Sequence, residues 1–343
     1  MHELLNVLYV QTQGAVLHLD GDTVRVEVER ETKLRAPLLR LGGIVVFGQV
    51  TVTPFLIHRC AMDGRSLVWM DRYGHFRARV EGAVRGNVLL RRAQHVALSN
   101  AAQTVHIARQ VVAAKLQNSR QVLLRAARET DHEESRQDLS ATAARLARIL
   151  GELPRLGDLN ALRGAEGEAG RAYFAVFWRM IRADQATFAL EGRTRRPPRD
   201  PTNALLSFLY ALVRSECASA LEGVGLDPQV GFLHALRPGR PALALDVMEE
   251  LRPVLADRLA ITLLNRRQLQ ARDFQTLPEG SVRLSDAGRK TVLTAYQQRK
   301  EEELQHRVLK QKLPLGLVPH VQARLLARYL RGDLETYPPF LYR

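Results

Sequence analysis

The hydrophobic pattern of the first 90 or so residues is typical of β-strands. Short apolar runs alternate there with glycine-containing turns. Residues 16–19 and 24–28 flank Asp20-Gly21-Asp22, a turn-forming triplet, and this arrangement predicts a β-hairpin. Further strands are predicted at 44–47, 67–70 and 76–80.

From residue 99 onward the apolar positions recur every three or four residues, which predicts helices. Ser99 or Asn100 is placed to cap the first helix. Gly223 is expected to end a later helix, and Pro253 to break or kink a helical stretch from about residue 243 to 269. The first helical face consists of Val105, Ala108, Val112, Lys115 and Leu116.

The two patterns predict an α+β protein. A small N-terminal β domain (residues 1–95) precedes a larger, all-α C-terminal domain (residues 96–343), and a length of 343 residues suits two domains. Cys60 and Cys217 lie far apart, which argues against a disulfide framework or a thiolate zinc site. Because no run of about 18 apolar residues and no signal sequence are found, we expect a cytoplasmic protein without a membrane segment.

The charge of the chain favours a polyanionic partner. Fifty Lys and Arg against 36 Asp and Glu give a formal net charge of +14. A run with four arginines, Arg193, Arg195, Arg196 and Arg199, surrounds a proline pair and predicts a phosphate-binding segment. The alternatives are a merely basic soluble protein and a solvated charged loop.

Four residues are candidates for a metal site: Glu166, His234, Asp246 and Glu249. Asp246 and Glu249 are three positions apart, so a helix would place both carboxylates on one face, where they can bind Mg²⁺ or Mn²⁺. In the alternative, Asp246 only begins the helix, Glu249 is solvated and His234 is an ordinary loop residue. Motifs of other hydrolases, such as HExxH or a Walker loop, are absent from the sequence.

Several segments, in this order along the chain, resemble the CRISPR-associated integrase, the first of the numbered Cas proteins, and particularly its version in type I-C systems. The resemblance covers nearly the whole chain. The segments that carry it are residues 5–10, 86–94, 163–174, 231–234, 243–253 and 322–327.

The resemblance implies a β domain that serves dimerisation and a helical domain that carries catalysis. It implies that Glu166, His234 and Glu249 bind Mn²⁺ or Mg²⁺, with Asp246 as an adjacent catalytic carboxylate. Arg163, Arg171 and Tyr173 lie near Glu166 in the sequence and are expected, with the four arginines of residues 193–199, to bind DNA, although Tyr173 could equally belong to the core.

The implied reaction is the insertion of captured foreign DNA as new spacers into a CRISPR array, by attack of a DNA 3′-hydroxyl on a repeat phosphodiester. The implied partners are protospacer and repeat DNA, a second copy of the chain and a small ferredoxin-like adaptation subunit. The alternative function is a basic nucleic-acid-binding scaffold with a vestigial metal site.

Overall fold

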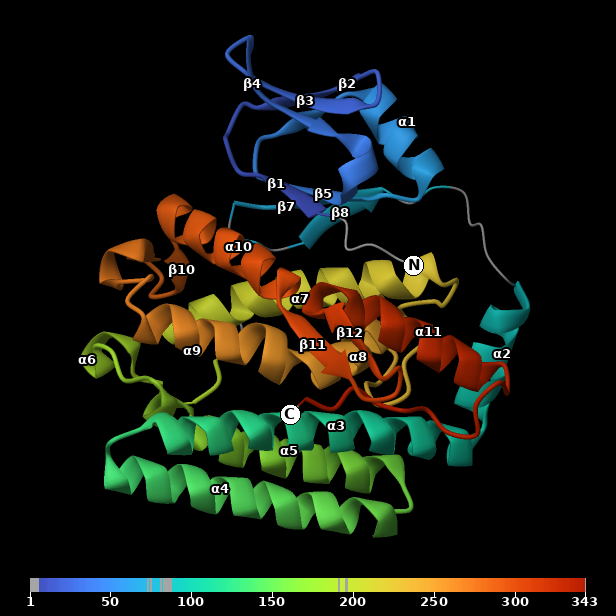
Figure 1. Ribbon diagram of the computed structural model, residues 1–343, viewed down its shortest axis with the longest axis vertical. Coiled ribbons are helices and arrows are strands. Elements are labelled where there is room, and N and C mark those ends of the chain that lie inside the picture. The colour runs from blue at the N-terminus through green and yellow to red at the C-terminus, as the bar shows by residue number, and fades with distance from the viewer. Residues whose placement is uncertain are drawn as a thin grey trace.

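The computed structural model places most strands and most helices in separate parts of the molecule (Figure 1). It describes residues 6–72, 74, 76–80, 82, 88–190, 192–194 and 197–342. The N-terminal strands lie at one end, and helices from residue 88 onward form the larger remainder. The predicted α+β class is therefore confirmed.

The N-terminal strands form sheets with the orders β4-β3-β2-β6 and β1-β5-β7-β8. Their bounds are β1 (Asn6–Val10), β2 (Val16–Asp20), β3 (Thr23–Val28), β4 (Glu31–Pro37), β5 (Leu41–Phe47), β6 (Thr51–Val52), β7 (Ser66–Met70) and β8 (Phe76–Val80). The predicted hairpin is present as β2–β3, with Asp20 paired with Thr23. The strands predicted at 44–47, 67–70 and 76–80 are confirmed within β5, β7 and β8.

Helix α1 (Pro54–Asp63) was not predicted in this part of the chain. Strands β5 and β7 pair in parallel, and parallel neighbours need a crossover connection, which α1 helps to supply. Local signals for the helix exist: Pro54 occupies its first turn, and Gly64 ends it with a left-handed backbone (φ 67°). The helix was missed because the segments on either side of it have the hydrophobic pattern of β-strands.

The larger part of the chain is mainly helical. Its helices are α2 (Val88–Ser99), α3 (Ala101–Glu129), α4 (Glu133–Glu152), α5 (Leu159–Ala175), α6 (Gln185–Phe188), α7 (Pro201–Gly223), α8 (Ala242–Arg252), α9 (Arg258–Asn265), α10 (Asp286–Glu301) and α11 (Val318–Leu330). It also contains short hairpins that were not predicted, β9 (Phe274–Thr276) with β10 (Val282–Leu284) and β11 (Glu303–His306) with β12 (Gln311–Pro314). Helix α2 begins at Val88, whereas the sequence analysis set the domain boundary at residue 95.

Three predicted local signals are confirmed. The Asn100 side chain caps α3 by accepting a hydrogen bond from the backbone N–H of Gln103 (3.1 Å). Helix α7 ends at Gly223. At Pro253, which has no N–H to donate, α8 gives way to a π-helical segment (Pro253–Asp257) that leads into α9.

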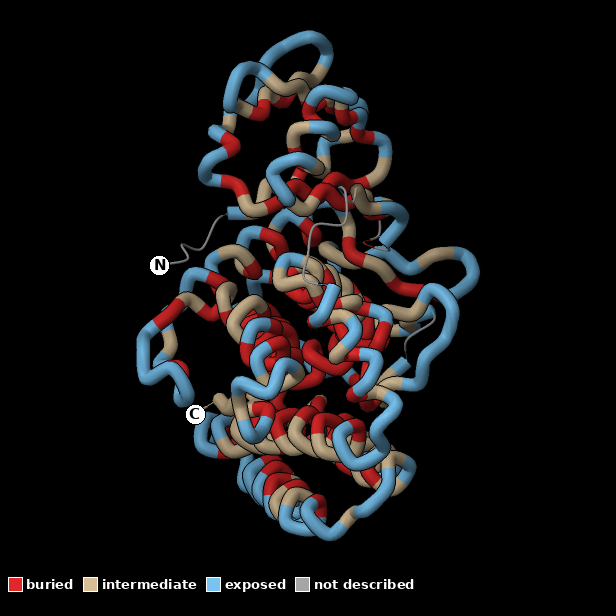
Figure 2. The backbone as a smooth tube through the Cα atoms, turned by 90° about the vertical axis from the view of Figure 1, so that its right-hand side faces the viewer, coloured by how far each residue is buried: buried red, intermediate tan, exposed pale blue. Residues whose placement is uncertain are grey.

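Helix α8 lies at the centre of the helical core, where it packs against α3, α7 and α11. Figure 2 shows that the buried residues concentrate in the middle of this part. Helix α7 is long and apolar enough to cross a membrane by length and composition, but 61% of the stretch concerned is buried inside the fold. Here it serves as a core helix.

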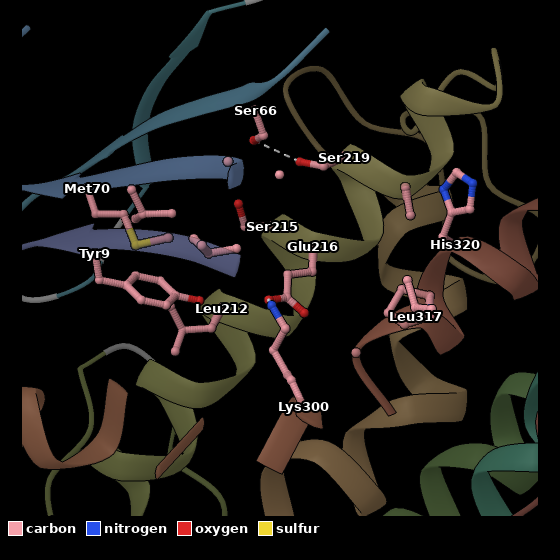
Figure 3. A pocket seen from close by; sticks show the side chains of 17 residues that line it. Tyr9, Ser66, Met70, Leu212, Ser215, Glu216, Ser219, Lys300, Leu317 and His320 are labelled. Carbon is pink, nitrogen blue, oxygen red and sulfur yellow. Dashed lines mark hydrogen bonds and ion pairs between the residues drawn. The ribbon is translucent and has the colours of Figure 1, made fainter. Parts of the chain in front are cut away.

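A cavity of about 260 Å³ lies between the β1-β5-β7 sheet and the helices α7 and α10 (Figure 3). Glu216 and Lys300 meet in it, with 2.6 Å between Oε1 and Nζ. The Tyr296 hydroxyl donates a hydrogen bond to the other oxygen of Glu216 (3.0 Å). The charge of this carboxylate is thus neutralised by one buried ammonium group, and its other oxygen accepts a hydrogen bond from one hydroxyl.

Candidate metal centre

Helix α8 carries acidic residues whose side chains are almost completely buried. Asp246 and Glu250 are fully buried, and Glu249 is 4% exposed. An ionised carboxylate in a protein interior is strongly destabilising unless hydrogen bonds or opposite charges compensate it. The fold provides a different set of partners for each of these side chains.

Asp246 binds the loop that precedes α8. Its Oδ2 accepts hydrogen bonds from the backbone N–H groups of Phe232 (2.6 Å) and Leu233 (3.0 Å), and its Oδ1 accepts one from that of His234 (3.0 Å). Nδ1 of the His234 ring lies 2.7 Å from the same Oδ1. If Nδ1 donates this bond, Nε2 keeps the lone pair that a metal requires. Asp246 therefore orients His234, and it does not begin the helix, which starts at Ala242.

Gly231 allows this loop to approach α8 closely. A Cβ atom at this position would lie 2.6 Å from the backbone carbonyl carbon of Ala242 and 2.8 Å from the backbone nitrogen of Leu243. Real Cβ atoms essentially never approach backbone this closely. The absence of a side chain at Gly231 is what brings the loop N–H groups within reach of Asp246.

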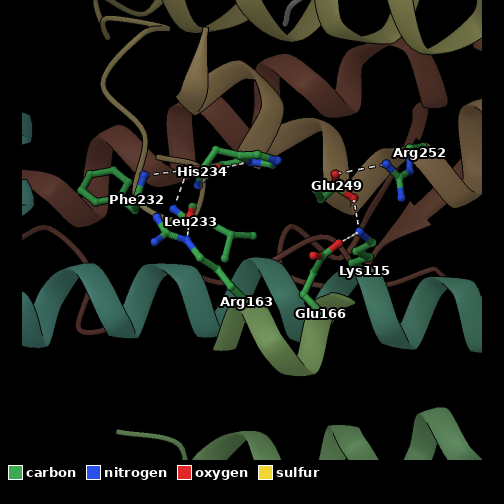
Figure 4. Close-up of polar contacts among 9 residues, drawn as sticks. Lys115, Arg163, Glu166, Phe232, Leu233, His234, Glu249 and Arg252 are labelled. Carbon is green, nitrogen blue, oxygen red and sulfur yellow. Dashed lines mark hydrogen bonds and ion pairs between the residues drawn. The ribbon is translucent and has the colours of Figure 1, made fainter. Parts of the chain in front are cut away.

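Glu166 and Glu249 are bridged by the ammonium group of Lys115 (Figure 4). The three residues lie on α5, α8 and α3, respectively. Nζ of Lys115 lies 2.7 Å from Oε2 of Glu249 and donates a hydrogen bond to Oε1 of Glu166. Two of the predicted metal ligands therefore meet at one point in the fold, with a side-chain cation between them.

Arg252 adds a second cation beside Glu249, with 3.1 Å between Nη1 and Oε1. Burial by itself raises the pKa of Glu249, but the positive charges of Arg252 and Lys115 outweigh it and lower that pKa below its ordinary value of 4.5. The guanidinium of Arg252 also lies over the ring of Tyr210, 4.9 Å from its centroid. The alternative of a solvated Glu249 is wrong, since its charge is buried and paired.

His234 is a neighbour of this cluster. Its charge, when the ring is protonated, also lowers the pKa of Glu249, and Figure 4 shows the side chain extending toward Glu249. Nε of Arg163, on the helix that carries Glu166, donates to the carbonyl of Leu233 (2.7 Å) and ties that helix to the loop of His234. In the described part of the chain, no three His, Cys, Asp or Glu side chains are arranged to hold a metal ion as they stand.

The other residues predicted to contact DNA near Glu166 have different environments. Arg171 is exposed and accessible to a ligand. Tyr173 is only 3% exposed, and its hydroxyl donates to Asp257 (3.1 Å), so the prediction of a DNA contact is wrong for Tyr173 and the core alternative is correct. A phenol ring packed among apolar side chains cannot reach a strand at the surface.

The arginines of residues 193–199 also differ. Arg199 is exposed. Nη1 of Arg193 donates to the Asn203 side chain (2.5 Å), and its guanidinium lies over the ring of Tyr210 at 5.1 Å, so it has structural contacts inside the fold. Arg195 and Arg196 lie outside the described residues.

The sequence analysis missed Lys115 and Arg252. Lys115 is the one charged residue in the first predicted helical face, between Val112 and Leu116, and a lysine within an apolar stripe is a signal for a buried charge. Arg252 lies one turn after Glu249 on the same helix, which predicts an ion pair. These signals do not identify the contacts with residues distant in sequence, namely Glu166 and Glu249 for Lys115 and the Tyr210 ring for Arg252.

The family model for CRISPR associated protein Cas1 matches residues 8–298. The CRISPR-associated endonuclease Cas1 1 of Moorella thermoacetica is 57% identical over 343 residues, which is the whole of both chains. The CRISPR-associated endonuclease Cas1 2 of Rhodospirillum rubrum is 52% identical over 347 residues, again with full coverage of both. The chain belongs to the Cas1 family.

Solved structures show the same fold at lower sequence identity. A CAS1 protein from Thermotoga maritima has a TM-score of 0.80 and 23% identity, with 97% of this chain and 99% of that chain covered. A casposase bound to an integration product has a TM-score of 0.84 and 21% identity, with 99% and 95% covered. The arrangement of a β-rich end and a larger helical part is therefore shared.

Replacement of Gly231 by alanine should destabilise the protein by about 1–3 kcal/mol, because the new methyl group forces the loop away from α8. Urea unfolding measures this change. The control is Gly151→Ala, since a Cβ atom in that position on α4 meets nothing within 4 Å, and there alanine should be neutral or stabilising by up to about 1 kcal/mol. Equal stability of the two variants would contradict the close approach.

The variant Glu249→Gln should be less stable than the wild type near neutral pH, on the order of 3–5 kcal/mol, because Lys115 and Arg252 lose a buried counter-charge. The folded-state pKa of Glu249 is lower than its ordinary value, so the stabilisation is present above pH 4.5 and is lost as the pH falls through the folded-state pKa. The difference in stability should therefore narrow in acid. Urea unfolding at a series of pH values checks this, with the exposed Glu168→Gln as control, and a pH-independent difference would refute it.

Proposed function

We propose that this protein is a metal-dependent DNA endonuclease and integrase. The observation that carries the proposal is that Glu166 and Glu249 meet around the ammonium group of Lys115. The imidazole of His234, which Asp246 orients, lies beside them. Family membership supports it, since the curated relatives are named endonucleases. The positive net charge of +14 suits a DNA substrate.

The residues that would hold Mn²⁺ or Mg²⁺ are Glu166, Glu249 and His234 through Nε2. Two carboxylates and one neutral imidazole suit these ions and leave coordination positions for phosphate oxygens. The position of the two carboxylates supports the binding of such an ion, because they already face one another across the positively charged ammonium group of Lys115. A divalent ion held by these residues would supply Lewis-acid chemistry, that is, polarisation of a phosphoryl oxygen and stabilisation of the charge that develops during phosphodiester cleavage or strand transfer.

The remaining residues of the site position these groups. Asp246 fixes the ring of His234, and Arg163 fixes the loop that carries it. Arg252 is held by Glu249 and by the Tyr210 ring, so it would supply a fixed positive charge at this site. The exposed Arg171 and Arg199 would bind backbone phosphates farther from the reaction.

We further propose that the strand transfer inserts captured DNA as new spacers into a CRISPR array, through attack of a DNA 3′-hydroxyl on a repeat phosphodiester. The likeness in fold to the casposase bound to an integration product supports this.

For partners we propose a second copy of the chain, bound through the β domain, and a small ferredoxin-like adaptation subunit. A chain of similar fold in a Cas6-RT-Cas1–Cas2 complex (TM-score 0.80, 24% identity) supports the adaptation subunit. We expect the protein to act in the cytoplasm.

Glu166→Gln and His234→Ala should each abolish strand transfer and cleavage on branched or spacer and repeat substrates, because each removes a metal ligand. Gel assays with and without Mn²⁺ measure this, and chelation of the metal should have the same effect. The matched control is Glu168→Gln, on the same helix but exposed and paired with Arg145. DNA binding with no metal-dependent reaction in the wild type would favour the scaffold function instead.

Arg199→Ala should weaken DNA binding to a similar extent for all sequences. One lost phosphate contact should reduce the slope of log K against log salt concentration by about 0.9. Fluorescence anisotropy over a salt series measures the slope. Arg145→Ala is the control, because Arg145 is already paired with Glu168, and equal slopes for Arg199→Ala and the wild type would exclude Arg199 from the interface.

A further inference from the structure

Lys115 has an unusual position for a lysine. It is 5% exposed, and it extends from α3 between carboxylates that belong to two other helices. A buried ammonium group is stable only when such partners neutralise it. The ammonium of Lys115 therefore occupies the space between Glu166 and Glu249 in which a metal bound by both carboxylates would lie (Figure 4).

We propose that Lys115 is a resident counter-cation that must leave these carboxylates before a divalent metal binds, and that a DNA phosphate then receives its ammonium group. Metal loading and DNA binding are thereby coupled. The inference rests on the proposed function, since it assigns a regulatory step to the same metal site.

The surrounding contacts favour displacement of Lys115 and not of Arg252. Arg252 is held on one side by Glu249 and on the other by the Tyr210 ring. Lys115 has a flexible four-carbon chain, and its ammonium group can move while its helix stays in place. One turn along α3, Asn118 fixes that helix by donating to the backbone carbonyls of Glu250 (2.7 Å) and Phe340 (2.9 Å).

The charges at the site explain why a DNA phosphate would favour the binding of the metal. Glu166 and Glu249 contact two side-chain cations, Lys115 and Arg252, and a third carboxylate, that of Asp246, holds the neighbouring His234. A divalent metal added to this set leaves an excess of positive charge, which one phosphodiester neutralises. Each ligand therefore improves the site for the other, and the coupling must be equal in both directions.

The cavity between the β-sheet and the helices offers a matched control (Figure 3). Lys300 is 3% exposed and forms an ion pair of 2.6 Å with Glu216. This ammonium group is as buried as that of Lys115, but its ion pair is with a single carboxylate among the described residues and lies outside the candidate metal centre. Loss of Lys300 should therefore affect stability without affecting metal binding.

The experiment is calorimetric titration of Mn²⁺ into the full chain, with and without a short blunt DNA duplex. Lys115→Met should bind Mn²⁺ more tightly than the wild type in the absence of DNA, on the order of tenfold, because no ammonium competes. DNA should raise the Mn²⁺ affinity of the wild type but have much less effect on that of Lys115→Met. Lys300→Met should behave as the wild type in both titrations.

Lys115→Gln serves as a second variant that removes the charge and keeps a polar group, in case the methionine variant does not fold. Thermal unfolding gives a further readout: either Lys115 variant should melt lower than the wild type without metal and gain more from added Mn²⁺. If Mn²⁺ binding is lost in Glu166→Gln but is not tighter in the Lys115 variants, the proposed role of Lys115 is wrong and the proposed metal site stands. Absence of Mn²⁺ binding in every variant would overturn the proposed metal site together with that role.

Discussion

The burial of three acidic side chains on α8 is the constraint on which the helical part of the fold depends. Asp246, Glu249 and Glu250 lie in the core of the molecule, where an unpaired charge would be strongly destabilising. The fold meets this constraint by bringing distant segments to one helix. The loop of His234 binds Asp246, α3 and α5 meet at Glu249, and the C-terminal segment binds Glu250.

The partners of Glu250 show how far this arrangement extends. Its two oxygens accept hydrogen bonds from the Tyr337 hydroxyl (2.6 Å), the Phe340 backbone N–H (2.8 Å) and the Gln322 side chain (3.0 Å). Burial raises the pKa of Glu250 to about 7, and these donors act against that rise. Apolar residues would stabilise a core as well as such polar contacts do, so the contacts are better explained by precise placement of the neighbouring Glu249.

Local features of this structure could be predicted from the sequence, whereas the partners of the buried charges could not. The hairpin at residues 20–22 and the Asn100 cap depend on neighbouring residues, and both are confirmed. Tyr173 was ambiguous, since a tyrosine on an apolar face suits a core and a ligand site equally well. The bridge from Lys115 to Glu166 and Glu249 joins three helices, and no spacing in the sequence encodes such a meeting.

The two cations missed by the sequence analysis, Arg252 and Lys115, also differ in how firmly their contacts hold them. The guanidinium groups of Arg252 and Arg193 both lie over the Tyr210 ring, 4.9 and 5.1 Å from its centroid, so one aromatic side chain connects Arg252 with the predicted phosphate-binding segment. Asp257 accepts the hydroxyl hydrogen bond of Tyr210 (2.5 Å) and fixes that ring. The guanidinium of Arg252, held by Glu249 and the Tyr210 ring, is therefore suited to act as a fixed positive charge in the proposed reaction. The ammonium of Lys115 is held by the carboxylates of Glu166 and Glu249 and is suited to exchange with another cation.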